Sequence, residues 1–581
     1  MTETMIQRPT AWGAAPRASG GLREPAWLDR LSAGAWWALL GAALTALLAL
    51  QLFYWTGSIA SDDLSYLRAG LDPFQYGHVA GAQQVFARVM MWLPLRISVE
   101  LLGNRWQALL PWALFSANLT LLLVGLCAWR WWGRTAALVA VLSLGLVPQY
   151  VTVASVALPD TVGAMFGIGG LLLIVPTLVE PNGRPAWRRC LLGGLLIGLG
   201  YSAKETSALL YPSLALFVLL WRRRSRKAWY GLFAVAAGAL LYLAGETLVL
   251  WAITGDPLFH LNSVRAGCRG YGSPVPDNSW RTIAWYTSDY LRWLADPTSA
   301  YGAWGLAYLA ALAFALWHRT NHRRLLLCCA LLGGFYLSAG TVDLRNYFPI
   351  YHQPRYLIPL LPVGALLVAD MTVSLWRRGG WRRPAVASAA VLLCAGSLLW
   401  PDRTAGRMYH ASTFHAARLL LENTEPVWTS SSRFVGSHAA AFRLTVLMDK
   451  PGRPPIEPLH DSPVTARQWQ ARYGDAYVWV TKQDREYPRA ADGVYLGAPS
   501  YAALRTFPCV ARQNPPANRM NQLKAWLGLE PRREDPWAAV EVYYVPPAAG
   551  PTALLQNPET ETRAAGRSSA AGPTPEVARV A

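Results

Sequence analysis

Two adjacent carboxylates, Asp62 and Asp63, stand in a short polar stretch that directly follows the first long apolar segment of the chain. A charge drawn toward hydrocarbon loses its hydration. Acidic residues at the end of a membrane segment therefore need water or a polar partner close by, or they have a role in a reaction. If the stretch is helical, Asp62 and Tyr66 share one face, whereas Asp63 points elsewhere. The two acids would then have different neighbours and could have different roles in acid–base chemistry. The alternative is a helix cap, with Ser61 as the N-cap and both acids meeting the helix dipole.

The composition indicates a membrane protein. The chain has 581 residues, of which 53% are hydrophobic and only 15% are charged, whereas soluble domains carry about 25% charged residues. Its 28 tryptophans and 25 tyrosines fit aromatic belts at the two membrane interfaces. The net charge of +19 could suggest nucleic acid, but the basic residues form short clusters between apolar runs. Such clusters set topology and meet anionic headgroups, so we expect membrane lipids as partners and no nucleic acid.

The apolar runs predict a mostly α-helical membrane protein with about eleven transmembrane helices. Between the first two spans, the amphipathic segment Val85–Leu102, which carries Arg88 and Arg96, is expected to lie in the membrane interface. The expected spans are 33–55, 107–128, 135–150, 161–179, 190–203, 206–221, 229–253, 299–317, 325–342, a run from Tyr356 to Arg377, and 385–400.

Arginine clusters in alternate loops predict the sidedness of the chain. They include Arg130 with Arg134 and the run Arg222–Lys227, and the opposite loops are nearly free of basic residues. By the positive-inside rule the N-terminus is cytoplasmic, in the plasma or inner membrane. An odd number of spans then places everything after about residue 401 outside the cell.

Four regions are expected along the chain. The segment from 401 to 548 alternates helical stretches with strand-length apolar runs, which predicts a small extracytoplasmic α/β domain. Cys268 and Cys509 both fall in outer segments, where they could pair or stay free thiols. The expected regions are a disordered N-terminus at 1–30, a polytopic membrane domain at 31–400, the α/β domain at 401–548 and a disordered tail at 549–581.

The predicted topology brings several polar residues to the outer face. Taken singly, each is most often a helix cap or a snorkelling side chain. Asp160 after Pro159 is a good N-cap pattern, and Lys204 with Glu205 could be a simple ion pair. Together they suggest an acid–base site with cationic support for an anionic group. The set comprises Asp62, Asp63, Asp160, Lys204, Glu205, Arg345, His352 and Arg355.

Five short blocks follow one another over about residues 33 to 400. They are Asp62-Asp63-Leu64-Ser65-Tyr66, Pro159-Asp160, Gly198–Glu205, Thr254–Leu258 and Pro354–Pro359. In this order they resemble the GT-C type glycosyltransferases, in the group of dolichyl-phosphate-mannose protein mannosyltransferases and bacterial aminoarabinose transferases. That group usually has Asp-Glu where this chain has two aspartates, which is a conservative departure.

The resemblance implies a hexosyl or pentosyl transferase. It would move a sugar from a polyprenyl-phosphate donor to an acceptor glycan, lipid or protein on the outer face. The reaction needs a base for the acceptor hydroxyl and cations for the leaving phosphate. Some relatives use a divalent metal; several outer carboxylates would permit one, although no ligand spacing demands it. The candidate catalytic residues are Asp62, as the base, with Asp63 and Asp160; the candidate substrate-binding residues are Tyr66, Arg68, Lys204, Glu205, Arg355 and Tyr356.

Two other functions stay open at this stage. A transporter or flippase of lipid-linked sugars would place ionisable residues within spans, near the bilayer midplane. Glu246 lies inside the span 229–253 and is an exception in this chain. The remaining ionisable residues cluster at span ends, which favours an enzyme. An O-antigen ligase or polymerase would have a large late outer loop rich in Arg and His, whereas the acidic motif here comes early.

Overall fold

The computed structural model describes most of the segment from residue 31 to residue 379 and five β-strands beyond it. The residues described are 31–53, 66–67, 69–70, 83–103, 106–180, 186–270, 279–297, 299–341, 349–350, 352–379, 383 and 389, and the strands of residues 427–545. Asp62, Asp63, Arg68 and Arg345 lie outside this part of the chain. So do the segments 1–30 and 549–581, whose expected disorder stays a prediction.

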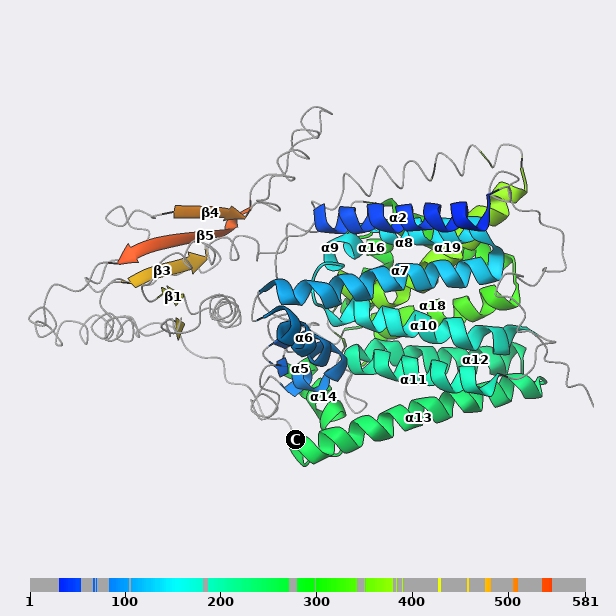
Figure 1. Ribbon diagram of the computed structural model, residues 1–581, viewed down its shortest axis with the longest axis horizontal. Coiled ribbons are helices and arrows are strands. Elements are labelled where there is room, and N and C mark those ends of the chain that lie inside the picture. Colours follow the sequence, from blue (N-terminus) through cyan, green and yellow to red (C-terminus); the bar gives the residue numbers. More distant parts are fainter. Residues whose placement is uncertain are drawn as a thin grey trace, which may run out of the picture.

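The described chain is mostly helical. The helices are α2 (Ala33–Phe53), α5 (Gln83–Ala87), α6 (Val89–Leu102), η1 (Trp106–Leu109), α7 (Leu110–Trp132), α8 (Arg134–Gly145), α9 (Pro148–Val153), α10 (Pro159–Val179), α11 (Trp187–Ala203), η2 (Glu205–Leu209), α12 (Leu210–Trp221), α13 (Arg226–Thr254), α14 (Phe259–Gly270), α15 (Trp280–Thr287), α16 (Asp289–Ala295), α17 (Ala303–Trp317), α18 (Asn321–Ala339), η3 (Pro354–Leu360) and α19 (Leu361–Arg377). Figure 1 shows α2, α7, α10, α11 and α13 side by side along the bundle, with α5, α6 and α14 gathered at one end.

Five segments are long and apolar enough to cross a membrane: Ala33–Leu52, Leu110–Trp132, Pro159–Val179, Arg226–Thr254 and Pro354–Arg377. Each corresponds to an expected span. The count of eleven stays a prediction, because other apolar helices are shorter and most of the expected span 385–400 lies outside the described residues.

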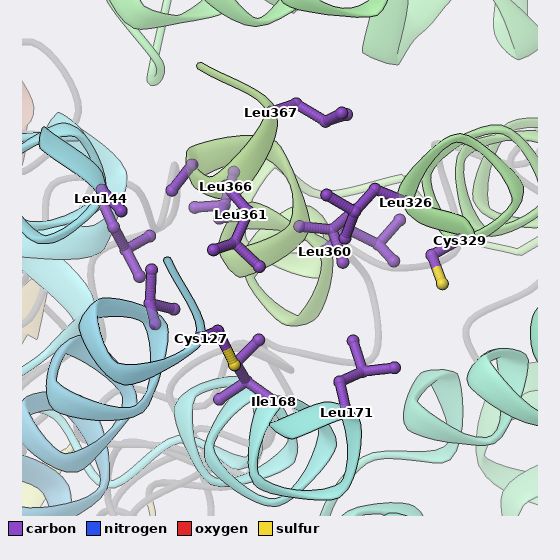
Figure 2. Close-up of a cluster of buried hydrophobic side chains, with 14 of the residues drawn as sticks. Cys127, Leu144, Ile168, Leu171, Leu326, Cys329, Leu360, Leu361, Leu366 and Leu367 are labelled. Carbon is purple, nitrogen blue, oxygen red and sulfur yellow. The ribbon is translucent and has the colours of Figure 1, made fainter. Parts of the chain in front are cut away.

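Helix α10 forms the centre of the bundle. It is buried along nearly its whole length and packs against α7, α11 and α13. Figure 2 shows Ile168 and Leu171 of α10 among apolar side chains from α7, α8, α18 and α19. A helix that is apolar all round is stable when other helices cover it, and this position fixes the first residue of interest, Asp160, in the protein interior.

Helices α11 and α13 approach each other at glycines. A Cβ atom added to Gly194 would stand 2.2 Å from the carbonyl oxygen of Val235, and one added to Gly238 would stand 2.1 Å from that of Leu191. Only glycine permits this backbone contact, as is common between membrane helices. The contact holds α11, and therefore Lys204 at its end, close to the long helix α13.

Two expected elements differ from the structure. The predicted span 135–150 is broken, because α8 ends at Gly145 and Pro148, which lacks an N–H group, begins the separate helix α9. The predicted amphipathic segment Val85–Leu102 is interrupted at Arg88, between α5 and α6. Arg88 turns inward and is buried, for reasons given below.

Five strands make a mixed sheet in the region 401–548. They are β1 (Val427–Thr429), β2 (Glu457–Pro458), β3 (Ala476–Thr481), β4 (Arg505–Cys509) and β5 (Asp535–Val545), in the order β2-β1-β3-β5-β4. β1 is parallel to β2 and β3, and β5 is antiparallel to β3 and β4. The helical stretches expected between the strands, and the side chains of Cys268 and Cys509, lie outside the described residues. The α/β domain and the disulfide therefore stay predictions.

Candidate active site

Lys204 stands at a break between two helices. It follows the last residue of α11 and precedes η2, and its backbone is extended (φ −146°, ψ 117°), so no loop separates α11 from η2 and α12. A Cβ atom on Gly163 of α10 would stand 2.9 Å from the Cβ of Lys204 and 2.8 Å from Ser207 Oγ. Glycine at this position of α10 therefore lets the break lie directly against the central helix.

The ammonium of Lys204 pairs with Asp160 inside the protein. Nζ lies 3.2 Å from Oδ1 of Asp160, and the exposed fractions of the two side chains are 8% and 0%. Neither carboxylate oxygen accepts a well-aligned hydrogen bond from the described part of the chain. A buried carboxylate with one partner is costly unless a further group completes its surroundings.

The other side of the Lys204 ammonium faces an aromatic ring. Nζ lies 3.9 Å from the ring centroid of Tyr356, a cation–π contact. Burial lowers the pKa of Lys204 below its ordinary value; Asp160 and Glu205 oppose the shift, and the cations Arg88 and Arg355 reinforce it. An ammonium whose charged form is disfavoured in this way would be stabilised by an added anion.

Arg88 links three segments that are distant in the sequence. It makes a bidentate pair with Glu205, with Nε and Nη2 at 3.0–3.1 Å from the carboxylate oxygens, and its Nη1 donates a hydrogen bond to the hydroxyl of Tyr66. Burial lowers the pKa of Arg88, but attraction to Glu205 and Tyr66 outweighs it, and the pKa is raised well above the ordinary value. For Glu205, burial raises the pKa, yet Arg88, Lys204 and His260 prevail and lower it. Both groups are therefore charged at neutral pH.

A histidine adjoins this pair on the side of α13. His260 of α14 stacks on Tyr201, with ring centroids 4.6 Å apart, and its Nδ1 lies 3.2 Å from Oε2 of Glu246. Its Nε2 lies 4.0 Å from Oε1 of Glu205, and Glu246 also accepts a hydrogen bond from the Tyr242 hydroxyl at 3.1 Å. Glu246, the ionisable residue inside a predicted span, thus has two partners at one end of the bundle.

Arg355 and Tyr356 are the second and third residues of η3. The guanidinium carbon of Arg355 lies 5.7 Å from the ring centroid of Tyr356, and its Nε donates to Oε1 of Gln353 at 2.7 Å. The nearby His352 is buried and pairs with Asp289. Burial lowers the pKa of His352, although Asp289 acts in the opposite direction.

The structure therefore joins several of the predicted site residues in one cluster. Tyr66, Asp160, Lys204, Glu205 and Tyr356 are connected by the contacts above, and Arg355 adjoins them through Tyr356. The predicted catalytic pair, Asp62 and Asp63, ends three residues before Tyr66 but lies outside the described residues. The roles assigned to all these residues stay predictions.

Sequence reasoning missed two members of the cluster. The sequence pattern predicts an amphipathic surface for Arg88 and does not include His260 in the site. The signal for His260 was Glu246, because a carboxylate inside a span needs a buried partner. Within the described ranges, no group of three or more His, Cys, Asp and Glu side chains could hold a metal ion. The divalent metal that the sequence permits but does not demand is not tested, since Asp62 and Asp63 lie outside those ranges.

Comparison with known proteins identifies the class of this fold. Residues 88–250 match the family model of dolichyl-phosphate-mannose-protein mannosyltransferase. The structure of ArnT from Cupriavidus metallidurans bound to undecaprenyl phosphate matches with a TM-score of 0.55 and 14% identity, over 90% of this chain and 100% of that one. Its apo state matches with a TM-score of 0.51 and 14% identity, over 88% and 98%.

A more distant likeness is to the oligosaccharyltransferase of Archaeoglobus fulgidus, with a TM-score of 0.45 and 11% identity over 80% of this chain and 70% of that one. No curated protein matches the sequence significantly. The chain has an ArnT-like fold with helices that span a membrane several times. It resembles the GT-C type glycosyltransferases of the mannosyltransferase and ArnT group, as the sequence predicted.

Proposed function

We propose that this protein is a membrane glycosyltransferase that moves a sugar from a polyprenyl-phosphate donor to an acceptor on the extracytoplasmic face. The observation that carries the proposal is the buried ammonium of Lys204, held between Asp160 and Tyr356 at one end of an ArnT-like bundle. Undecaprenyl phosphate is bound in the ArnT structure, so this fold accommodates a lipid phosphate. The acceptor is a glycan, a lipid or a protein.

Lys204 is suited to meet the donor phosphate. An ammonium carries three N–H bonds. Asp160 lies on one side of it at ion-pair distance and the Tyr356 ring covers a second side, so among the described residues a donor remains for a phosphate oxygen. Burial disfavours the charged form of Lys204, and a phosphate anion would reverse this by pairing with it. Arg355, beside Tyr356, would supply the second cation.

The transfer is a substitution at the anomeric carbon. The acceptor oxygen forms a bond to this carbon while the bond from carbon to phosphate oxygen breaks and its electron pair leaves with the polyprenyl phosphate. The leaving phosphate gains negative charge, which Lys204 and Arg355 would stabilise. The acceptor proton passes to a carboxylate, for which Asp62 is the proposed base.

The link from Arg88 to Tyr66 supports this place for the base. Tyr66 is buried, and its hydroxyl is tied through Arg88 to Glu205, the neighbour of Lys204. Asp62 precedes Tyr66 by four residues. The chain between them spans at most about 14 Å, which sets the greatest distance of the proposed base from Tyr66.

The test uses purified protein in lipid nanodiscs with radiolabelled polyprenyl-phosphate sugars. We expect wild type to release or transfer the sugar, and Asp62→Asn and Lys204→Met to lose at least a hundredfold in rate. Glu100→Gln is the matched control, since Glu100 is an exposed carboxylate that pairs with Arg96 on the surface of α6. It should keep the wild-type rate.

The outcomes separate the alternatives. Transfer that survives Asp62→Asn but not Lys204→Met would move the base to Asp63 or Asp160 and keep the donor class. Saturable lipid binding without transfer of any donor sugar would reject the enzyme and favour a transporter of lipid-linked sugars.

A further inference from the structure

The segment that carries Arg355 and Tyr356 is held by tyrosines of α15, of α16 and of the turn before α17. Three tyrosine hydroxyls donate hydrogen bonds to its backbone carbonyls: Tyr286 to Ile350 at 2.6 Å, Tyr290 to Gln353 at 3.3 Å, and Tyr301 to Pro354. Backbone carbonyls outside regular structure need such partners when they are buried. Three carbonyls at and just before the start of η3 are therefore fixed.

His352, in the same segment, makes contacts with Tyr286 and Asp289. The Tyr286 hydroxyl accepts a hydrogen bond from the backbone N–H of His352 at 2.8 Å, and the two rings stack with centroids 3.8 Å apart. Nδ1 of His352 lies 3.1 Å from Oδ2 of Asp289, the first residue of α16. The His352 side chain is only 2% exposed.

Asp289 is itself held in place. Its Oδ1 pairs with Arg292 one turn later in α16, and the guanidinium of Arg292 stacks 3.5 Å from the ring centroid of Trp285. The carboxylate therefore has a cation on one oxygen and the imidazole on the other. This arrangement fixes the orientation of the His352 ring in the way that a second partner orients an imidazole in many sites.

A short path leads from this contact to the phosphate-binding side chains. The carbonyl of Gln353 accepts from the Tyr290 hydroxyl and from the backbone N–H of Tyr356 at 3.0 Å. The side-chain oxygen of Gln353 accepts from Arg355 Nε. Displacement of residues 352–354 would therefore move both Arg355 and the ring that covers Lys204.

We infer that Tyr286, Asp289 and His352 are positioning residues of the site: they set residues 352–354 so that Arg355 and Tyr356 face Lys204 and the donor phosphate. The effect of these residues on donor binding rests on the proposed function, whereas their effect on the position of residues 352–354 does not. The group transfers no proton and touches no reacting atom.

The test compares variants that remove one contact each. Asp289→Ala deletes the acceptor for His352, whereas Asp289→Asn keeps an oxygen at the same place and should restore most of the effect. Tyr286→Phe removes one hydroxyl. Tyr211→Phe is the matched control, because its hydroxyl donates to a carbonyl oxygen of α11 at 2.8 Å, away from this segment.

The first readout is hydrogen–deuterium exchange of the backbone amides of residues 355–358. We expect Asp289→Ala and Tyr286→Phe to speed exchange at least tenfold, with Asp289→Asn and Tyr211→Phe within threefold of wild type. Unchanged exchange in both Asp289→Ala and Tyr286→Phe would overturn the inference, whatever the protein catalyses.

The second readout is the kinetics of donor use. A mispositioned phosphate site should raise the KM for the lipid donor at least tenfold while kcat changes less than threefold, since the reacting groups remain. An equal rise in KM for the control Tyr211→Phe, or a loss in kcat of the positioning variants as large as the rise in KM, would show a general effect of instability and would contradict a positioning role. If wild type transfers no sugar, the proposed function fails, and the exchange data alone decide the inference.

Discussion

The buried pair of Asp160 and Lys204 makes a prediction whose size follows from the structure. At the observed separation of 3.2 Å, the attraction between the two charges is about 5 kcal/mol for an effective dielectric constant of about 20. Loss of one partner leaves the other charge buried, which typically costs about 3–5 kcal/mol. We expect Lys204→Met and Asp160→Asn each to lower the free energy of unfolding by about this amount.

The double variant distinguishes coupling from two separate defects. With both charges removed, neither member of this pair is left as an unpaired buried ion, so the double variant should be no less stable than the less stable of the two single variants. The two single losses would sum to about 6–10 kcal/mol if they were independent, so we expect an interaction energy of about 3 kcal/mol or more.

The assay is reversible unfolding in mixed micelles, followed by tryptophan fluorescence. The exposed pair of Arg96 and Glu100 gives the control, since Glu100→Gln should change the free energy of unfolding by no more than about 0.5 kcal/mol. If the losses of Lys204→Met and Asp160→Asn add to within about 0.5 kcal/mol, the two side chains do not depend on each other and the reasoning fails.

Three other predictions concern packing, pH and charge geometry. Gly238→Ala should destabilise the protein by about 1–3 kcal/mol, since its Cβ would stand 2.1 Å from a carbonyl oxygen of α11. A Cβ at Gly245 of the same helix meets nothing within 4 Å, so Gly245→Ala should leave the stability unchanged; thermal unfolding of the two variants checks this. Burial lowers the pKa of His352, so just below pH 6.5 the unfolded chain binds more protons than the folded one and stability falls as the pH drops; the Tm–pH profile of His352→Gln should lose this part of the slope. Arg88→Lys keeps the charge, but an ammonium lacks the planar guanidinium geometry that lets Arg88 bind Glu205 and Tyr66 together, so donor turnover should fall at least tenfold. A full wild-type rate in this variant would show that charge alone suffices.

Much of the site could be predicted because its residues stand at span ends. A lysine next to a glutamate, between two apolar runs with no room for a loop, is placed at a membrane surface by length alone. Asp160 after Pro159 is placed in the same way at the start of α10. The structure adds that these two ends meet and that Asp160 is fully buried, which depends on the glycine at 163 and is not visible in the spacing.

The remainder could not be predicted because its contacts are distant in the sequence. Arg88 and Glu205 are 117 residues apart, and His352 and Asp289 are 63 residues apart. Periodicity places a residue on a face of its own helix, but it does not say which other helix covers that face. Arg88 also stands at a break between α5 and α6, where the helical pattern that made it a surface residue no longer applies.

A buried ion pair alone does not mark a site, and the described bundle contains an instructive contrast. Arg323 of α18 pairs with Asp370 of α19, and its guanidinium also donates to Ser374 Oγ at 3.0 Å and to the carbonyl oxygen of His318 at 2.8 Å. Both oxygens of Asp370 accept from Arg323, so that pair is complete and serves to join two helices.

Asp160 and Lys204 are more deeply buried as a pair, yet neither oxygen of Asp160 accepts a well-aligned hydrogen bond from the described residues. The Asp160–Lys204 pair is costly to bury, and the described residues do not complete its hydrogen bonds. Such a pair suits ligand binding better than a purely structural contact between helices. This difference is the reason to place the donor phosphate at Lys204 rather than at the equally conspicuous Arg323.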